Sequence, residues 1–513
     1  MPVLTALDVL AIQSFVFGTN RLRDAITGSS LVEWATDADG ALRRARSRLL
    51  QAAGGNAWLQ FDRIEDARAF TTAYTRALLN EAPGLETVVV HRPYEAGQLA
   101  RALLAVQIEI AREKLERFPS VPLAGLGVNA LCRYTRLPAT GVNELGEPVS
   151  TRIQQFALHE SQAVERWRAF LPVKGSTELD FPVLNDDLGR TAGDTSVYGI
   201  VHVDGNGVGR RIDEWLRSCI RDSDPDDGVR DQFREWSNDL KRRGRRTMEA
   251  VVARVERGRK QDRIEGAYAE LGFDLAVDPK TGSRMLPIRP VLIGGDDLTF
   301  LCDGRIALDL AAAALDSFTS EAVPHLGPLS ACAGVAIVKS HAPFYRAYDL
   351  AERLCASAKR CRVEQRDSGN WIDWHIGAVP AGHGLSEVRE QQYTHDGRKL
   401  TCRPYRMGPH AGVTESWRWL SDTVLGVKGF RSPHWKGSRN KIKELRRVIR
   451  EGPSAVERTV ATWPRELELP GDLPGSGFFD GIRTPLLDAA ELLDLYLPLA
   501  DSKSDATDGV MSK

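Results

Sequence analysis

The feature that most constrains this chain is the tetrapeptide Gly294-Gly295-Asp296-Asp297, which lies between two apolar runs. Val291–Ile293 leads into the glycine pair and Leu298–Leu301 follows the aspartates. Two apolar runs joined by glycines predict a tight hairpin with acids at its tip. Adjacent carboxylates raise each other's pKa unless a cation neutralises them. The hairpin therefore indicates a metal site, although an exposed Gly-Gly-Asp-Asp turn is the simpler alternative.

A second acidic segment, Asp204-Gly205-Asn206-Gly207-Val208-Gly209, follows the strand expected at 198–203. A carboxylate there, followed by a glycine loop that opens a helix, places a metal ligand beside main-chain N–H groups that bind phosphate. Alone, the loop also fits a dinucleotide-type glycine loop or a plain Asn-Gly turn. Together with the hairpin it predicts three catalytic, metal-binding carboxylates: Asp204, Asp296 and Asp297. Such acids hold two Mg²⁺ or Mn²⁺ ions for in-line attack on a triphosphate.

Nucleotide binding is expected from the glycines around these acids and from one lysine. Lys359 lies towards the end of the helix expected at 343–361, where a cation would neutralise a leaving pyrophosphate. A lysine at a helix end is also often only a solvated charge that favours the helix dipole. The predicted nucleotide-binding residues are Gly205, Asn206, Gly207, Gly209, Gly294, Gly295 and Lys359.

The order of expected elements repeats along the chain. Strands are expected at 3–12, 57–61 and 87–90 and helices at 29–52, 64–81 and 95–117. The later half has strands at 198–203 and 330–338, the hairpin at 291–301, and helices at 208–216, 305–320 and 343–361. Gly54-Gly55-Asn56-Ala57 occupies the place that the acidic hairpin occupies later, and Lys114 the place of Lys359. A duplicated fold whose first copy lacks the acids is the interpretation, although βα periodicity alone produces similar patterns.

These repeats predict an α+β fold with two ferredoxin-like palm domains, the second carrying Gly-Gly-Asp-Asp, and a C-terminal helical region. The expected parts are a degenerate first palm at 1–132, a connector at 133–195 with a short helix at 159–170, and a catalytic palm at 196–376. A charged insertion at 221–285 contains a long helix or helix pair at 228–268. A loop and helical domain follows at 377–500, with helices near 415–426, 436–451 and 485–497, and then a disordered tail at 501–513.

Composition narrows the partners. The net charge of −1 excludes a global bias towards nucleic acid, and seven scattered cysteines favour a reducing cytosol, so a cytoplasmic protein without membrane contact is expected. Local basic stretches remain. Lys241–Arg246 is one, and 398–450 holds many Lys and Arg residues interleaved with Trp417, Trp419, Phe430 and Trp435. That mixture suits RNA backbone and stacking contacts, although charge runs on helices are usually solvated faces.

These motifs resemble a known family. The chain is similar to the large palm-domain subunit of type III CRISPR effector complexes, the polymerase-like protein that makes cyclic oligoadenylates. The resemblance covers most of the chain and includes Ile12–Phe17, Gly28-Ser29-Ser30, Asp204–Gly207, Gly294–Asp297, Gly334–Val338 and Ala358-Lys359.

The resemblance implies two packed palm domains of which only the second is catalytic, with ATP as substrate. It also implies divalent metal at Asp204, Asp296 and Asp297, with the Gly205 carbonyl as a further ligand. Guide RNA, other CRISPR effector subunits or a second copy of the chain are the implied macromolecular partners. Many members carry an N-terminal HD nuclease domain, and this chain begins directly at the first palm, so DNA cleavage is not expected.

The leading hypothesis is a nucleotidyltransferase that converts ATP to a cyclic oligonucleotide messenger in antiviral defence. One alternative is a catalytically silent subunit that binds RNA and partner proteins. A relative of diguanylate cyclases is another, but that resemblance would require Glu and then Phe where this chain has Asp297 and Leu298.

Overall fold

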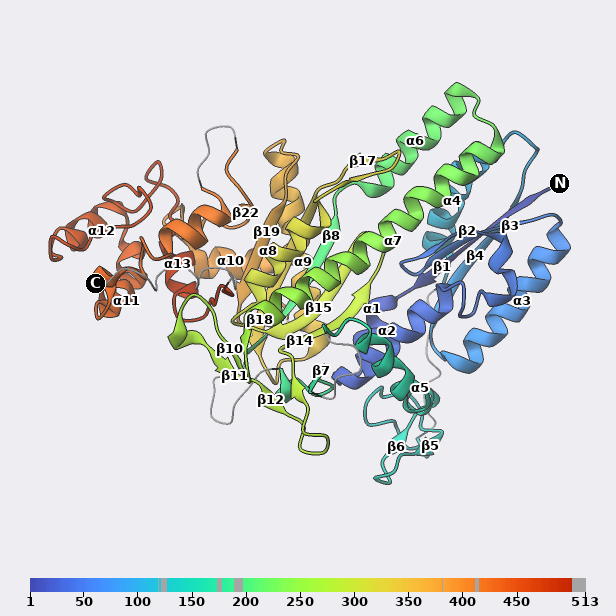
Figure 1. Ribbon diagram of the computed structural model, residues 1–513, viewed down its shortest axis with the longest axis horizontal. Coiled ribbons are helices and arrows are strands. Elements are labelled where there is room, and N and C mark those ends of the chain that lie inside the picture. Colours follow the sequence, from blue (N-terminus) through green and yellow to red (C-terminus); the bar gives the residue numbers. More distant parts are fainter. Residues whose placement is uncertain are drawn as a thin grey trace, which may run out of the picture.

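The computed structural model describes residues 1–118, 120, 127–172, 178–188, 197–380, 382–410 and 415–500. Two β-sheets form its framework, one in the N-terminal part and one in the middle of the chain (Figure 1). We call residues 1–118 the first sheet unit and residues 197–380 the second sheet unit. The C-terminal part lies at the opposite end of the molecule from the first sheet unit (Figure 1).

The first sheet has four strands in the order β2-β3-β1-β4. Its strands are β1 (Val3–Leu10), β2 (Leu49–Ala53), β3 (Asn56–Phe61) and β4 (Glu86–Pro93). The helices of this unit are α1 (Ile12–Phe17), α2 (Leu22–Thr36), α3 (Ile64–Glu81) and α4 (Leu99–Glu116). The apolar β1 is central and almost wholly buried, because β3 and β4 pair with its two edges and α3 and α4 pack against it.

The second sheet has six strands in the order β14-β15-β8-β18-β19-β22. Its strands are β8 (Val197–Gly205), β14 (Ile288–Ile293), β15 (Asp297–Asp303), β18 (Ala331–Lys339), β19 (Trp371–Ile376) and β22 (Tyr405–Arg406). The pairing of β18 with β19 is parallel and the other pairings are antiparallel. Helices α8 (Ala307–Phe318) and α9 (Phe344–Glu364) pack on β8 and β18, the two strands at the centre.

Four strands of each sheet correspond in order and direction. The series β2-β3-β1-β4 matches β14-β15-β8-β18, and both are antiparallel throughout. The hairpin turn of the first series holds Gly54 and Gly55, and that of the second holds Gly294 to Asp296. A Cβ on Gly54 would lie 3.4 Å from the Gly295 nitrogen, so the two hairpin tips face each other. The sheets are therefore arranged with their glycine turns in contact.

A long charged helix joins the two sheets. Helix α6 (Val208–Asp222) is followed by α7 (Asp226–Arg257), which runs diagonally across the molecule (Figure 1) and contacts both β2 and β14. Aspartates in its first turn and arginines in its last turn stabilise α7, because their charges compensate the helix dipole at each end. Small strands complete the insertion: β9 (Arg259–Lys260), β10 (Arg263–Ile264), β11 (Phe273–Asp274), β12 (Ala276–Val277) and β13 (Arg284–Met285). As one continuous helix, α7 packs against β2, an edge strand of the first sheet, and against β14, an edge strand of the second.

The segment between the two units is short and mixed. It contains β5 (Gly141–Val142), β6 (Pro148–Val149), α5 (Thr151–Arg168) and β7 (Leu179–Asp180). Helix α5 packs against α2 and buries Phe156 and Trp167. The connector thereby becomes part of the core of the first sheet unit.

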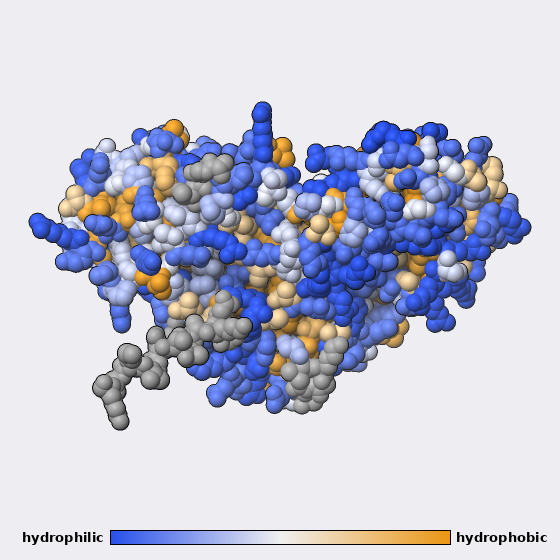
Figure 2. Space-filling view, turned by 45° about the horizontal axis from the view of Figure 1, so that its top comes forward, coloured by the Kyte–Doolittle hydropathy of each residue, from blue (hydrophilic) through white to orange (hydrophobic). Residues whose placement is uncertain are grey.

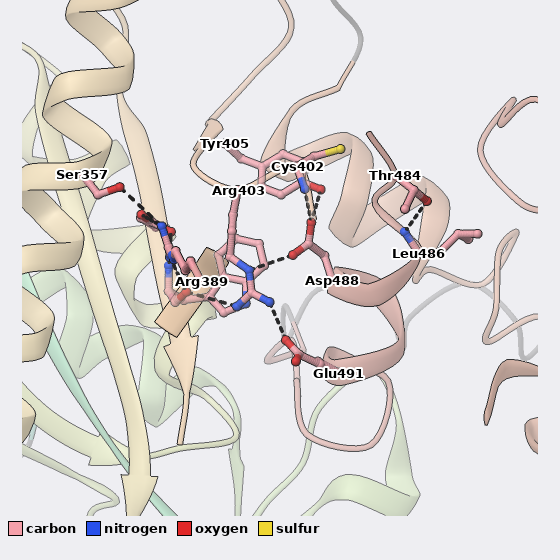
Figure 3. A network of polar contacts seen from close by, with 11 residues as sticks. Ser357, Arg389, Cys402, Arg403, Tyr405, Thr484, Leu486, Asp488 and Glu491 are labelled. Carbon is pink, nitrogen blue, oxygen red and sulfur yellow. Dashed lines mark hydrogen bonds and ion pairs between the residues drawn. The ribbon is translucent and has the colours of Figure 1, made fainter. Parts of the chain in front are cut away.

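A buried network of charged groups fastens the C-terminal part to the second sheet (Figure 3). The helices there are α10 (Leu385–Tyr393), α11 (Arg439–Val448), α12 (Pro453–Val460) and α13 (Leu486–Leu492). Arg403, 1% exposed at its side chain, pairs with Asp488 at 2.8 Å and also with Glu491, both on or beside α13. Arg389 of α10 pairs with the buried Asp373 of β19 at 2.7 Å. Since an unpaired buried charge is costly, each of these ions requires its partner.

Several elements differ from the sequence expectations. The prediction of a helix at 29–52 is wrong: α2 ends at Thr36, a 3-10 turn covers Arg43–Arg48, and β2 follows. The run of alanine and arginine residues has helical propensity, but β2 is held by its pairing with β3, which overrides that preference. The expected helix at 159–170 is the C-terminal half of the longer α5, and that at 415–426 is a short π-helical segment, Trp419–Val424. The tail expected at 501–513 lies outside the described residues.

The surface is mainly hydrophilic, with apolar residues in separate groups on the face shown in Figure 2. Among the described residues, no helix combines the length and apolar character needed to cross a membrane.

Candidate functional site

The strand register brings the predicted acids together. Asp297 opens β15 and pairs directly with Asp204 near the end of β8. The Gly205 N–H donates a hydrogen bond of 2.8 Å to the Asp296 carbonyl, so the third acid lies beside the same strand end. Directly opposed residues in an antiparallel pair have Cβ atoms about 4.5–5.5 Å apart, within bridging distance of a divalent ion. Asp204 therefore lies beside the adjacent Asp296 and Asp297, which are far from it in the sequence.

Lys359 joins this cluster from α9. Its Nζ lies 2.6 Å from Asp204 Oδ2 and 3.3 Å from the Gly205 carbonyl oxygen. Helix α9 can lie close to the sheet because β18 has Gly334 beneath it, where an added Cβ would come within 1.9 Å of the Ala351 carbonyl oxygen. Gly334 thus sets the distance between α9 and β8 and so the position of the lysine.

The electrostatics of the cluster favour cation binding. Burial, with the charges of Asp204 and Asp297, raises the pKa of Asp296 to about 6. Burial, with the charges of Asp204 and Glu352, raises the pKa of Asp297 to about 7. Burial would lower the pKa of Lys359, but the charge and hydrogen bond of Asp204 raise it above its ordinary value. One lysine thus faces three carboxylates. The excess negative charge favours the protonated forms of the acids as long as no cation is bound.

One oxygen of Asp297 has no hydrogen-bond partner among the described residues. Oδ1 is buried, while the side chain as a whole is 44% exposed, so its other oxygen faces solvent. His202 Nδ1 lies 3.5 Å from Oδ1 but is 3.1 Å from Thr299 Oγ1. Burial lowers the pKa of His202, which favours the neutral imidazole and leaves Asp297 without a positive neighbour on that side.

The donor set fits a hard divalent cation. Three carboxylates and the Gly205 carbonyl offer the oxygen ligands that Mg²⁺ and Mn²⁺ prefer. Asp297 Oδ1, which has no hydrogen-bond partner among the described residues, is available to bind such an ion. Among the described residues, the three side chains whose ligand atoms all lie within 4.8 Å of one another are His202, Asp204 and Cys355, so the oxygens of the three acids lie further apart than that in this structure. Both His202 and Cys355 are buried, so the accessible side of the site is the oxygen-rich side.

The remaining predicted nucleotide-binding residues have different surroundings. Asn206 turns away from solvent: its N–H donates to the Ser330 carbonyl at 2.7 Å and its amide to Ser330 Oγ at 3.1 Å. Gly207 has a φ of 67° and precedes α6, and Gly209 has open space where a Cβ would be. A Cβ on Gly205 would lie 3.0 Å from the Asp296 Cβ, so this glycine permits the close approach of the two acidic segments.

Two cavities share Asp297. The larger, about 430 Å³, is bounded by α1 and by Tyr345 and Tyr348 of α9. The narrower inner cleft, about 70 Å³, runs between α2 and the two hairpins and includes Arg166 and Lys241. Arg166 pairs with Glu33 there, and burial with the charge of Arg245 lowers its pKa to about 10.

The sequence singled out neither Arg166 nor Tyr348, and Lys241 only as part of the basic stretch Lys241–Arg246. Arg166, Lys241 and Tyr348 come from α5, α7 and α9, and only the packing of the two units brings them to Asp297. Gln13 is another residue that only the packing of the two units brings into place. Its side-chain amide donates a hydrogen bond of 2.8 Å to Glu352 Oε1 in the other unit. The sequence contains only weak indications of these residues, although Gln13 lies within the Ile12–Phe17 motif of the family resemblance.

The expected RNA-stacking aromatics are not available on the surface. Trp417, Phe430 and Trp435 are each at most 4% exposed and pack in the C-terminal core. Within the other basic stretch, Arg243 is fully buried and donates hydrogen bonds to the Phe318 and Glu321 carbonyls. The stacking interpretation of these three aromatics is therefore wrong, because they are buried in the core. Trp419 is partly buried, its indole N–H donates to the Gly471 carbonyl at 3.1 Å, and its contact with RNA stays a prediction.

Comparisons with known proteins give structural likenesses only. No family model matches the chain, and no curated protein matches it. A Csm1-Csm4 cassette in complex with cA4 has a TM-score of 0.48 and 15% identity, covering 96% of this chain and 69% of the other. The same cassette with AMPPNP gives 0.48 and 16%, covering 97% and 70%, and Csm1 in T. onnurineus gives 0.49 and 14%, covering 96% and 69%.

These neighbours are Csm1 subunits, described for one of them as part of the type III-A CRISPR-Csm interference complex. They belong to the kind of subunit whose resemblance the sequence motifs predicted. At identities of 14–16% and TM-scores below 0.5, the likeness carries no weight for activity, which is inferred below from the chain's own residues.

Proposed function

We propose that this protein is a metal-dependent nucleotidyl cyclase that converts ATP into a cyclic oligonucleotide messenger for antiviral defence. The observation that carries the proposal is the direct pairing of Asp204 with Asp297, with Asp296 beside them. Three acids lie at one strand end, and two of them have raised pKa values. Perturbed carboxylates in a cleft are typical of a catalytic site.

Asp204, Asp296, Asp297 and the Gly205 carbonyl would hold two Mg²⁺ or Mn²⁺ ions. Bound there, such ions make a nucleotide 3′-hydroxyl a better nucleophile and stabilise the charge on the attacked phosphate. The reaction forms a bond between the 3′-oxygen and the α-phosphorus of a second ATP and breaks its bond to the β-phosphate. Pyrophosphate leaves, the hydroxyl proton passes to solvent, and a final transfer within one chain closes the ring.

The cations around the acids have a defined part in this proposal. Lys359, now paired with Asp204, is placed to accept phosphate oxygens when the carboxylate binds another cation. Lys241 lies on the inner cleft 3.8 Å from Asp37, and Arg166 lies beside it. These two side chains extend positive charge from the acids towards the position of a triphosphate. A Cβ added at Gly294 would lie 3.2 Å from the Asp297 carbonyl oxygen, so this glycine permits the tight turn that carries the acids.

The proposal extends to assembly with other CRISPR effector subunits, on the strength of the sequence resemblance. A supporting observation is the exposed apolar end of α4, where Ile108, Leu115 and Phe118 are 64%, 88% and 91% exposed. Apolar side chains so exposed are common at protein contacts. Guide RNA and a second copy of the chain remain predicted partners.

Incubation of the purified chain with α-labelled ATP or GTP and Mg²⁺ or Mn²⁺ tests the proposal. Labelled ATP should be incorporated into oligonucleotides, and the Asp296→Ala/Asp297→Ala double variant should lose at least about 100-fold of the rate, because metal stabilisation supplies several kcal/mol. The exposed Asp62→Asn serves as the matched control. Undiminished incorporation in the double variant would remove the proposed site.

The same assay separates the alternatives. Incorporation of GTP alone would favour the diguanylate-cyclase relative. Absence of turnover with tight RNA binding would favour the catalytically silent subunit.

A further inference from the structure

A further cavity, of about 590 Å³, lies on the first sheet unit, and we call it the outer pocket. Its walls are Trp34 at the end of α2, the segment Asp39–Arg44, and one face of α3. The α3 residues recur at helical spacing: Phe70, Ala73, Tyr74, Ala77, Asn80 and Glu81, with Arg76 beside them. None of these residues lines the two cavities that contain Asp297. The volume is within the range of small-ligand pockets.

The charge of the outer pocket is positive. Arg43, Arg44 and Arg76 are exposed at its wall, and within the described ranges none of the three has an ion-pair partner. Of the two acids of the wall, Asp39 pairs with Arg46 at 2.6 Å, and Glu81 makes a hydrogen bond of 3.2 Å with His159. Three uncompensated guanidinium groups around one concavity favour an anion with several oxygens, such as a phosphate.

The lining also offers flat apolar surfaces. Phe70 stacks on Tyr74 with ring centroids 5.9 Å apart, and Ala73 and Ala77 leave a shallow strip along α3. Trp34 lies half-buried on the opposite wall. An aromatic ring inserted between these walls would stack in the manner of a nucleobase on aromatic side chains.

One buried polar group in the outer pocket lacks a partner. Tyr74 is 2% exposed and its hydroxyl makes no hydrogen bond to the described residues. The hydroxyl is closed off from solvent in the pocket, so Tyr74 contributes to the pocket wall through its ring, which stacks on Phe70.

We propose that the outer pocket binds a nucleoside phosphate. The base lies between Trp34 and α3, the phosphate lies among Arg43, Arg44 and Arg76, and the Asn80 amide reaches the base edge. Helix α2 separates this pocket from the inner cleft, since Glu33 and Asp37 line the cleft while Trp34 lines the outer pocket. The site stands independently of the proposed cyclase activity. The ligand is either a free mononucleotide or adenylates joined by phosphodiester bonds.

Equilibrium dialysis on the full chain tests the proposal. The background is Asp296→Asn/Asp297→Asn with EDTA, so turnover and metal-held nucleotide do not contribute. The probes are labelled AMP and the linear dinucleotide pApA, with adenosine, inorganic phosphate and a short single-stranded RNA as comparisons. Binding of AMP, of pApA, or of both is expected, and the stronger of the two identifies the source of the ligand.

Arg43→Gln/Arg44→Gln/Arg76→Gln should weaken that binding at least about tenfold, because charge-assisted hydrogen bonds are lost. Arg101→Gln, an exposed arginine on α4, is the matched control and should leave binding unchanged. Tyr74→Phe keeps the ring of the pocket wall and should leave binding unchanged, because the hydroxyl that it removes is closed off from the pocket. Binding unaffected by the triple variant, equal loss in the control, or affinity for RNA or inorganic phosphate alone would overturn the proposal.

Discussion

The two sheet units share a framework and differ at one hairpin. Each has a carboxylate near the end of a central strand, β1 or β8, that pairs with a lysine. The lysine comes from the helix that follows the neighbouring strand, α4 after β4 or α9 after β18. The distances are 2.5 Å for Asp8 and Lys114 and 2.6 Å for Asp204 and Lys359. Opposite Asp8 the register places Asn56, whereas opposite Asp204 it places Asp297. The carboxylate–lysine pair is therefore common to both units. What distinguishes the second is the added negative charge of its hairpin.

The largest effect should separate the two central carboxylates. Asp204→Asn is expected to lower the rate of label incorporation from ATP at least about 100-fold, since a metal ligand is lost. Asp8→Asn is isosteric in the equivalent pair and should change the rate by no more than about fivefold, the worth of a modest ion pair. Initial rates of both variants measure this. Equal losses, with both proteins folded by circular dichroism, would show that the first unit shares the chemistry.

The two lysines should differ less. Lys359→Met is expected to reduce turnover about 10- to 100-fold, because a charge-assisted contact to phosphate is worth roughly 1.5–3 kcal/mol. Lys114→Met should leave turnover nearly unchanged, and Lys359→Arg should restore part of the lost rate. Single-turnover rates at saturating ATP report the difference. A null result for Lys359→Met would place the lysine outside the reaction.

The smallest effect concerns stability without metal. In the unfolded chain Asp297 loses its proton near pH 4, but in the folded protein burial and neighbouring acids raise its pKa to about 7. Between these values the folded state holds more protons, so its stability falls as the pH rises. Asp297→Asn should therefore raise the unfolding temperature in EDTA at pH 8 and change it little at pH 5. Thermal melts at both pH values, with Asp62→Asn as control, decide this; an equal shift at both would contradict it.

Much of the framework could be predicted from sequence because it depends on local pattern. The apolar runs before Asp204 and around the hairpin form strands as predicted, and Lys359 lies on the helix expected after Pro343. The extent of α2 could not be predicted, because β2 is fixed by pairing with β3 rather than by its own residues. Strand β19 was missed as well; it is held by its parallel pairing with β18.

The candidate site divides in the same way. The proximity of Asp204 to Asp297 follows from strand ends that the sequence marks with glycines. The cleft cations Arg166 and Lys241 lie on helices outside the repeated pattern, so only tertiary packing brings them near Asp297. Asn206 contacts Ser330 and so secures the loop, and its contact with nucleotide stays a prediction.

The buried ions around Arg403 limit how the chain can be shortened. A fragment ending at Ile376 would lose β22 from the edge of the second sheet and uncover Trp374, which stacks on Tyr405 at 5.5 Å. Asp373 would keep its place on β19 without Arg389, leaving a lone carboxylate in an apolar setting. The smallest autonomous piece that contains the acids must then extend through Glu491, and expression trials should choose their end points accordingly.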